Sequence, residues 1–419
     1  MTAKLSKGQL AAVVAGNALE FYDFLIFSFF AIQIGQVFFP GGSETASLLK
    51  TLAVFGVGFL TRPLGGMVIG PLSDRIGRKP TMLFTFALMG LSIAGLALTP
   101  SYASIGVAAP LLVVFFRLAQ GFALGGEVGP TTAFLLESAP RQRRGLYVSL
   151  QNATQYFSVL CVGLIGTALT SVMSPAAFGD WGWRAAMLLG AGMVPCAWML
   201  RRRLPETLHA QADCEPAPRA RLVVVAFSIL MIAGLTISTY LMNYLATYAQ
   251  HTLGVLPQLA SLCTVVGGAC AMLGSLLGGH LSDRFGRKPV MLVGATALLV
   301  LGVPCYMAML LFNSPAVLLT LAGLLAFFVG VFPPAVLTNI CESFSAAQRA
   351  GAVGITYALA VAGFGGSAQY AVTWLIDYTG SPLAPAWYMT GAMVLSIIGM
   401  LAMRETAPAK LGAHFSIEP

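Results

Sequence analysis

The stretch LSDRIGRKP at residues 72–80 returns as LSDRFGRKP at residues 281–289, with eight of nine positions identical. A weaker repeat pairs ESAPRQRRG at 137–145 with ESFSAAQRAG at 342–351. In each half of the chain the strong motif follows the second apolar segment and the weak motif follows the fourth. We therefore predict that the chain consists of two halves with the same order of helices.

The composition predicts a membrane protein. The chain has 419 residues, of which 57% are hydrophobic and only 9% charged, and its mean hydropathy is +0.82. A soluble protein of this length carries about a quarter charged residues. So few charges cannot cover a surface that faces water on all sides, and most of the surface is expected to contact membrane lipid.

The apolar segments predict twelve membrane-spanning helices, because a helix needs about 20 apolar residues to cross a bilayer. The fold class expected is all-α, a polytopic membrane protein with two pseudo-symmetric six-helix bundles. A parallel repeat of this kind is an architecture of secondary transporters. The predicted spans lie near 9–38, 48–71, 81–99, 106–137, 145–173, 183–201, 222–250, 257–280, 290–312, 315–341, 350–376 and 386–403.

One long polar stretch, RRLPETLHAQADCEPAPRAR at 202–221, divides the chain near its middle. Its proline and charge content is typical of a surface linker. We expect an N-terminal bundle over 1–201, a cytoplasmic linker over 202–221 and a C-terminal bundle over 222–419.

The basic residues predict the orientation. With an inside N-terminus, the outside segments keep only Lys50 and Arg184, and the remaining loop Lys and Arg residues lie inside. Cytoplasmic loops carry this excess, so both termini are expected in the cytoplasm. The net charge of +8 is spread over these loops, which argues against nucleic acid as a partner. The cysteines show no ligand spacing, so we predict no metal site.

Four motifs resemble the major facilitator superfamily. They are the repeated D-R-x-G-R-[KR] loop, RLAQGFALGGE at 117–127, GNALEFYDF at 16–24 and RPLGG at 62–66. The last two narrow the resemblance to the metabolite:proton symporter family. Within that family the chain resembles the bacterial citrate and tricarballylate proton symporters.

The resemblance implies a secondary active transporter and not an enzyme. It would import a small organic acid, a di- or tricarboxylate such as citrate, together with protons by alternating access. The implied location is the bacterial inner membrane, with a monomer driven by the proton gradient and no cofactor. Pro333-Pro334 departs from the pattern of citrate carriers, so dicarboxylates and other acids stay open.

The repeated loops are candidates for a conformational lock. Their acids could pair with arginine or accept backbone N–H bonds at a helix N-terminus, and their glycines permit a tight turn. The alternative is a plain topology signal made of basic residues. The candidate lock residues are Asp74, Arg75, Gly77, Arg78, Asp283, Arg284, Gly286 and Arg287.

Five ionisable residues fall within the predicted spans, all in the first half: Glu20, Asp23, Arg62, Arg117 and Glu127. Such groups are costly in hydrocarbon and mark ion or substrate pathways. Three acids against two arginines leave one surplus negative charge, so one acid is expected to be protonated for part of the cycle. We predict proton coupling by Asp23, Glu20 and Glu127 with Arg117; a static ion-pair network is the alternative.

The two arginines also suit a carboxylate substrate, because a guanidinium binds carboxylate through two parallel hydrogen bonds. For Arg62 the alternative is a structural partner of Glu20 or Asp23. Amides and phenols on other spans could complete the substrate site, or could only join helices. These candidates are Gln151, Asn152, Gln155, Tyr240, Asn243, Tyr244 and Asn339.

Two other functions were weighed against uptake. A proton-driven exporter of an amphipathic compound would use the same fold but would have a more apolar cavity. A membrane enzyme or sensor would need a catalytic cluster or a large soluble domain, and the sequence indicates neither.

Overall fold

The structure is a computed structural model that describes residues 17–18, 21–22, 24–76, 78–125, 128–202, 222–312 and 314–411. Within these ranges every regular element is a helix, as the sequence predicts. Eight of the helices are long and apolar enough to cross a membrane, and the shorter apolar stretches Leu83–Leu98 and Ala108–Leu124 lie between them. The order of the helices follows the twelve predicted spans.

The first half begins with helical residues 17–18, 21–22 and 24–29, and a turn at Phe30 separates them from α2. The further helices are α2 (Ala31–Phe38), α3 (Glu44–Ile76), α4 (Arg78–Leu98), α5 (Tyr102–Ile105), α6 (Ala108–Leu124), α7 (Val128–Ser138), α8 (Arg144–Val172), α9 (Pro175–Ala177) and α10 (Trp183–Arg202). A 3₁₀ turn, η1 (Arg141–Arg143), precedes α8, and a π-helical turn, η2 (Phe178–Gly182), precedes α10.

The second half contains α11 (Leu222–His251), α12 (Pro257–Phe285), α13 (Arg287–Phe312), α14 (Pro315–Val331), α15 (Pro333–Glu342), α16 (Ala346–Ala360), η4 (Val361–Gly365), α17 (Gly366–Thr379), α18 (Ala384–Ala402) and α19 (Pro408–Leu411). Of the predicted linker only residue 202 is described, so the boundary of the two halves stays a prediction.

Three further predicted spans are interrupted. The span 106–137 is divided into α6 and α7. The span 315–341 breaks at Phe332, because Pro333 and Pro334 lack the N–H groups that would continue α14. The span 350–376 contains the π-helical turn η4, a feature often found at functional sites.

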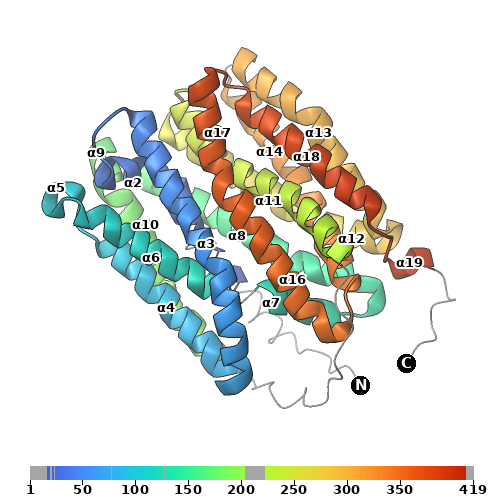
Figure 1. The fold of residues 1–419 in the computed structure, drawn as a ribbon. Coiled ribbons are helices and arrows are strands. Elements are labelled where there is room, and N and C mark those ends of the chain that lie inside the picture. Colours follow the sequence, from blue (N-terminus) through green and yellow to red (C-terminus); the bar gives the residue numbers. More distant parts are fainter. Residues whose placement is uncertain are drawn as a thin grey trace.

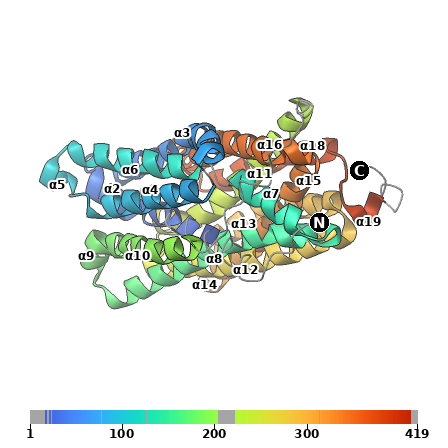
Figure 2. The same cartoon turned by 90° about the horizontal axis from the view of Figure 1, so that it is seen from below.

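The two halves lie side by side, with the blue to green helices of the first half beside the yellow to red helices of the second (Figure 1). The helix pairs that join them include α8 with α12, α3 with α17, and α7 with α16. The view from below shows α8 and α12 running together (Figure 2).

Glycines allow close approach where helices cross. A Cβ on Gly163 of α8 would meet the backbone of α12 at Val265, and a Cβ on Gly268 of α12 would meet α8 at Leu160. Within the first half, a Cβ on Gly121 of α6 would collide with the carbonyl oxygen of Gly58 on α3. This contact holds α6 and α3 backbone to backbone at the level of Arg117 and Arg62.

We predict that Gly121→Ala destabilises the protein by about 1–3 kcal/mol, the usual cost of overpacking a close contact. The midpoint of thermal unfolding in detergent measures this loss. Gly391→Ala on α18 is the matched control, because a Cβ there meets nothing within 4 Å. Equal midpoints for the two variants would contradict the close packing of α3 against α6.

Candidate functional site

Arg117 on α6 is completely buried. Its Nη1 donates to Gln120 Oε1 at 2.8 Å and its Nη2 to the carbonyl oxygen of Phe55 at 3.3 Å. Its guanidinium carbon lies 4.8, 4.5 and 5.0 Å from the ring centres of Phe24, Phe27 and Phe55. Within the described residues Nε has no hydrogen-bond partner. In that part of the chain, aromatic faces and neutral acceptors surround the positive charge.

Arg62 on α3 lies beside it, 5% exposed. Its guanidinium carbon is 4.6 Å from the ring centre of Phe24 and 4.2 Å from that of Phe59. The two arginines thus share the Phe24 ring and are close enough to repel each other. Cation–π contacts of this kind are each worth about 0.5–2 kcal/mol, which lowers the cost of burying the charges but does not neutralise them.

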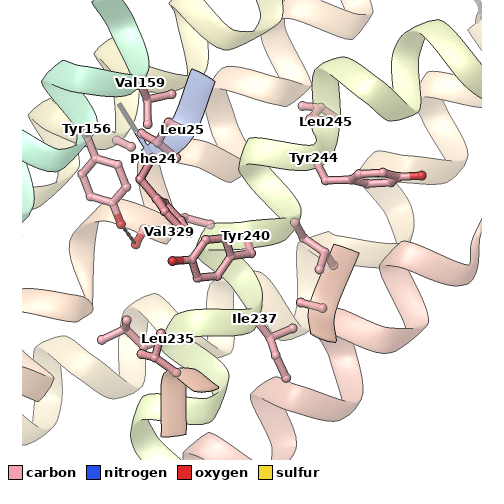
Figure 3. Packing of buried hydrophobic residues seen from close by; sticks show 14 of the residues in the cluster. Phe24, Leu25, Tyr156, Val159, Leu235, Ile237, Tyr240, Tyr244, Leu245 and Val329 are labelled. Atoms are coloured by element: carbon pink, nitrogen blue, oxygen red, sulfur yellow. Dashed lines mark hydrogen bonds between the residues drawn. The ribbon is translucent and has the colours of Figure 1, made fainter. Parts of the chain in front are cut away.

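Tyr240 of α11 completes the group from the second half. Its ring meets those of Phe24, Phe55 and Phe59 edge to face, with centroids 6.4, 6.0 and 5.3 Å apart. The side chain also interacts electrostatically with both arginines. Figure 3 shows the Tyr240 ring directed toward Phe24, whereas Tyr244 points away from it. We call the two arginines with Phe24, Phe27, Phe55, Phe59 and Tyr240 the arginine cluster.

The candidate amides on α8 are buried and only partly bonded. Gln151 Oε1 accepts a bond from Thr132 at 2.8 Å, while its Nε2 has no partner among the residues that the structure describes. Asn152 is 4% exposed, and its Oδ1 is likewise unpaired. Gln155 is partly buried. Unused buried amide atoms are costly, which makes Gln151 and Asn152 candidates for ligand contacts.

The other candidate substrate-binding residues do not lie together. Asn243 lines a small cavity with Ser28 of the first half and Thr264 of α12, and its Oδ1 is unpaired. The Tyr244 hydroxyl accepts from Thr373 Oγ1 at 2.8 Å within the second half.

Asn339 lies far along α15, where its Nδ2 donates to the carbonyl oxygen of Arg404 and to Thr406 Oγ1. The structure does not bring Asn339 to the arginine cluster, because its amide holds the segment after α18.

Several predicted residues cannot be placed. Glu20, Asp23 and Glu127, the three candidate proton carriers, lie outside the described residues, as does Gly77. The side chains of Asp74, Arg75 and Arg78 are also outside what the structure describes.

The second copy of the repeated loop is described completely. Asp283 accepts two backbone N–H bonds of 2.8 Å, from Gly145 and Leu146 at the start of α8. It therefore joins a loop of the second half to a helix N-terminus of the first, where a negative charge is favourable. Gly286 has φ +106°, a conformation that glycine adopts without strain.

Arg287 is the buried arginine of this loop. It contacts Asp283 Oδ1 at 2.6 Å and Glu342 Oε2 at 3.3 Å. Arg284, which the sequence grouped with it, is exposed and lies over the Phe285 ring. Arg287, and not Arg284, therefore ties the loop to its neighbours.

The weak repeat supplies two reciprocal ion pairs between the halves. Glu137 at the end of α7 pairs with Arg349 of α16 at 2.8 Å, and Glu342 at the end of α15 pairs with Arg144 of α8 at 3.5 Å. Each repeat copy thus gives its acid to the arginine of the other. Sequence reasoning noticed the repeat but missed these roles.

Glu405, after α18, was also missed. Its two carboxylate oxygens accept the backbone N–H groups of Arg287 and Lys288 at 2.9 Å each. The neighbouring Thr406 hydroxyl donates to Glu342 Oε2 at 2.7 Å. No motif distinguishes this glutamate, because only the folding back of the chain brings it to α13. We call Asp283, Arg287, Glu342, Glu405 and Arg144 the motif network.

The halves also meet at the opposite end of the molecule. Thr45 Oγ1 of α3 lies 3.4 Å from His251 Nε2 of α11, and Gln258 Nε2 of α12 donates to the carbonyl oxygen of Thr170 at 3.4 Å. Together with the motif network, these contacts join the two halves on either side of the arginine cluster.

Comparisons with known proteins agree with this architecture. Residues 9–209 match the family model described as sugar (and other) transporter, and residues 222–417 match that of the major facilitator superfamily. A citrate-proton symporter of Klebsiella pneumoniae is 36% identical over 406 residues, which cover 94% of this chain and 90% of that protein.

Relatives with other names have a similar sequence identity. An alpha-ketoglutarate permease of Escherichia coli (strain K12) is 32% identical, covering 97% of this chain and 96% of that protein. A proline/betaine transporter of the same strain is 32% identical, covering 96% and 84%.

The fold is that of known symporters. The proton:xylose symporter XylE superposes with a TM-score of 0.77 at 20% identity, covering 95% of this chain and 96% of that chain. The E. coli fucose:proton symporter FucP gives 0.65 at 16% identity, covering 94% and 97%.

Fold and site together define a multi-pass membrane transporter and not an enzyme. The chain belongs to the major facilitator superfamily. The predicted fold of two pseudo-symmetric six-helix bundles is thereby confirmed.

We predict that Asp283→Ala opens the motif end of the molecule, because it removes the carboxylate that accepts two backbone N–H bonds from α8 and that pairs with Arg287. A single cysteine placed by Ser149→Cys at the α8–α12 contact, in a chain whose own cysteines are replaced, reports the opening. Its alkylation should accelerate by about ten- to hundredfold, the equivalent of one hydrogen bond to a charged group.

Arg284→Gln is the control, because Arg284 lies in the same loop but is exposed. It should leave the alkylation rate unchanged. An equal rate in Asp283→Ala and the unaltered protein would rule out the Asp283 contact as a closure of this end.

Proposed function

We propose that this protein is a proton-coupled symporter that imports a small organic acid, a di- or tricarboxylate such as citrate, across the bacterial inner membrane by alternating access. The observation that carries the proposal is the buried pair Arg62 and Arg117. A buried charge without an opposite charge is strongly unfavourable, and a carboxylate matches the guanidinium fork. The names of the citrate-proton and alpha-ketoglutarate relatives support an acid.

Proton coupling would follow from competition for the same arginines. Asp23, Glu20 and Glu127 are the candidate carriers, and Phe24, whose ring contacts both guanidinium groups, follows Asp23 directly in the sequence. Protonation of one acid would free Arg117, assisted by Arg62, to hold the substrate carboxylate. Loss of that proton to the cytoplasm would return the arginine to the acid and release the anion.

The remaining site would recognise the rest of the substrate. Gln151 and Asn152 offer unpaired amide atoms from the first half, and Asn243 and Tyr240 offer polar groups from the second. The motif network and its first-half counterpart around Asp74 would set the inward–outward equilibrium at the cytoplasmic end. The protein would work as a monomer on the proton gradient, with both termini in the cytoplasm.

A zwitterion is the second candidate substrate. Relatives at 32% identity are named as proline/betaine transporters, and the aromatic rings of the arginine cluster also suit a quaternary amine. In this structure those ring faces carry the two guanidinium groups, which favours the acid.

In proteoliposomes with an inward proton gradient we expect one of citrate, alpha-ketoglutarate or a related dicarboxylate to accumulate. A protonophore should abolish accumulation, because entry against the gradient of the acid needs the proton gradient. Proline and betaine serve as the contrasting substrates. Uptake that ignores the proton gradient would refute symport, and accumulation of proline or betaine alone would move the substrate class to zwitterions.

Asp23→Asn should abolish gradient-driven accumulation, because an amide cannot carry the proton. Asp377→Asn, an exposed carboxylate on α17, is the matched control and should accumulate substrate normally. If Asp23→Asn accumulates substrate as the unaltered protein does, Asp23 is not the essential carrier.

Arg117→Lys should raise KM for the acid by about ten- to hundredfold, since lysine keeps the charge but loses the fork that makes charged hydrogen bonds. Arg184→Lys is the control: Arg184 donates to the carbonyl oxygens of Ala97 and Thr99, away from the cluster. An unchanged KM in Arg117→Lys would exclude Arg117 as the carboxylate ligand.

A further inference from the structure

Gln369 on α17 is completely buried, and both ends of its amide are bonded to other helices. Its Oε1 accepts from Ser28 Oγ of the first half at 2.9 Å, and its Nε2 donates to the carbonyl oxygen of Tyr240 on α11 at 3.2 Å. Because a carbonyl oxygen can only accept, the second bond fixes the orientation of the amide. Ser28 must then be the donor in the first.

The backbone around η4 brings Gln369 to this place. A Cβ on Gly365 would collide with the Tyr240 ring and Thr236, and a Cβ on Gly366 would press on Phe59 and the Gly56 carbonyl oxygen. These two glycines therefore let the start of α17 pack closely against the Thr236 and Tyr240 side chains of α11 and against Gly56 and Phe59 of α3. Gln369 follows one turn later.

Both partners of Gln369 are connected to the arginine cluster. Ser28 lies one helical turn after Phe24, whose ring contacts Arg62 and Arg117. Tyr240 carries the ring that meets Phe24 from the second half. One amide thus holds the first-half segment that bears Phe24 and the second-half residue that faces it.

This arrangement depends on the closed position of the two halves. Ser28 belongs to the first half, whereas Gln369 and Tyr240 belong to the second. When the halves separate at this level, the Ser28 bond is lost while the Tyr240 bond remains within the second half. The Ser28–Gln369 bond therefore stabilises specifically the arrangement in which the halves are in contact at this level.

We propose that Gln369 is a positioning residue for transport: it aligns Tyr240 over the arginine cluster and couples occupation of the site to closure of the halves through Ser28. The proposal rests on the proposed function, because it takes the arginine cluster as the substrate site. Gln369 would act through Tyr240 and Ser28 and would not itself be the carboxylate ligand.

The test is a double-mutant cycle of Ser28→Ala and Gln369→Leu in proteoliposomes loaded with the acid. Each variant should slow the exchange of labelled acid by about two- to tenfold, the range of one net hydrogen bond. The double variant should be no slower than the slower single variant, because both changes remove the same contact. Ser28→Thr, which keeps the hydroxyl, should restore exchange.

Thr373→Val is the matched control. Thr373 lies one turn beyond Gln369, and its hydroxyl bonds to the Tyr244 hydroxyl and to the backbone carbonyl oxygen of Gln369, both within the second half, so its loss removes buried bonding but no contact between the halves. Its effect should multiply with that of Ser28→Ala. If the Ser28 and Gln369 effects multiply instead, or if Ser28→Thr fails to restore exchange, the coupling role is overturned.

A second readout needs no substrate and separates this proposal from the proposed function. Spin labels at Ser43→Cys and Thr252→Cys, in a chain whose own cysteines are replaced, report the distance between the halves near Thr45 and His251. Ser28→Ala and Gln369→Leu should each lower the closed population by the same two- to tenfold factor, with Thr373→Val unchanged. An unchanged distance distribution in both variants would overturn the inference even if acid uptake is observed. Absence of acid uptake by the unaltered protein would refute the proposed function and leave this distance test standing.

Discussion

Two buried positive charges constrain the whole of this structure. Arg62 and Arg117 lie within the membrane-spanning region, where the described groups around them are aromatic faces, backbone carbonyl oxygens and neutral side chains. Such contacts reduce the cost of burial but leave the charge uncompensated. In the proposed mechanism the acids of the first half and the substrate carboxylate compete for this charge. That competition would link the movement of protons to the movement of the anion without any cofactor.

Helices α8 and α17 connect the site to contacts between the two halves. Helix α8 carries Gln151 and Asn152, and its N-terminus is held by Asp283 of the other half. Gly145 and Gln151 are six residues apart, or about 9 Å along a helix, so the site and the motif network lie on one rigid element. On the other side, α17 carries Gln369 beside the arginine cluster. A change at the arginine cluster would therefore affect both the Asp283 contact at the start of α8 and the Gln369 contact on α17.

Sequence reasoning predicted the helix order from the repeated loops, and it selected Arg62, Arg117 and Tyr240, which the structure brings together. It did not find Glu405, because nothing local marks a residue whose partners lie more than a hundred positions away in the chain. For Asn339 and Tyr244 the sequence could not show whether the side chain faces the site or joins helices. A shift of one helical turn changes which neighbouring helix a side chain contacts, and the sequence does not specify the neighbour. The break at Phe332 follows from Pro333-Pro334. Sequence reasoning used this proline pair only as an indication about the substrate and did not predict a helix break from it.

The most direct test of the central claim is the movement of protons when the acid is added. In a weakly buffered suspension of proteoliposomes without an imposed gradient, adding the transported acid should make the external medium more alkaline, because protons enter with it. The same addition to Arg117→Ala proteoliposomes should give no change in pH. Acidification, or a constant pH during measurable entry of the acid, would contradict proton symport through the arginine cluster.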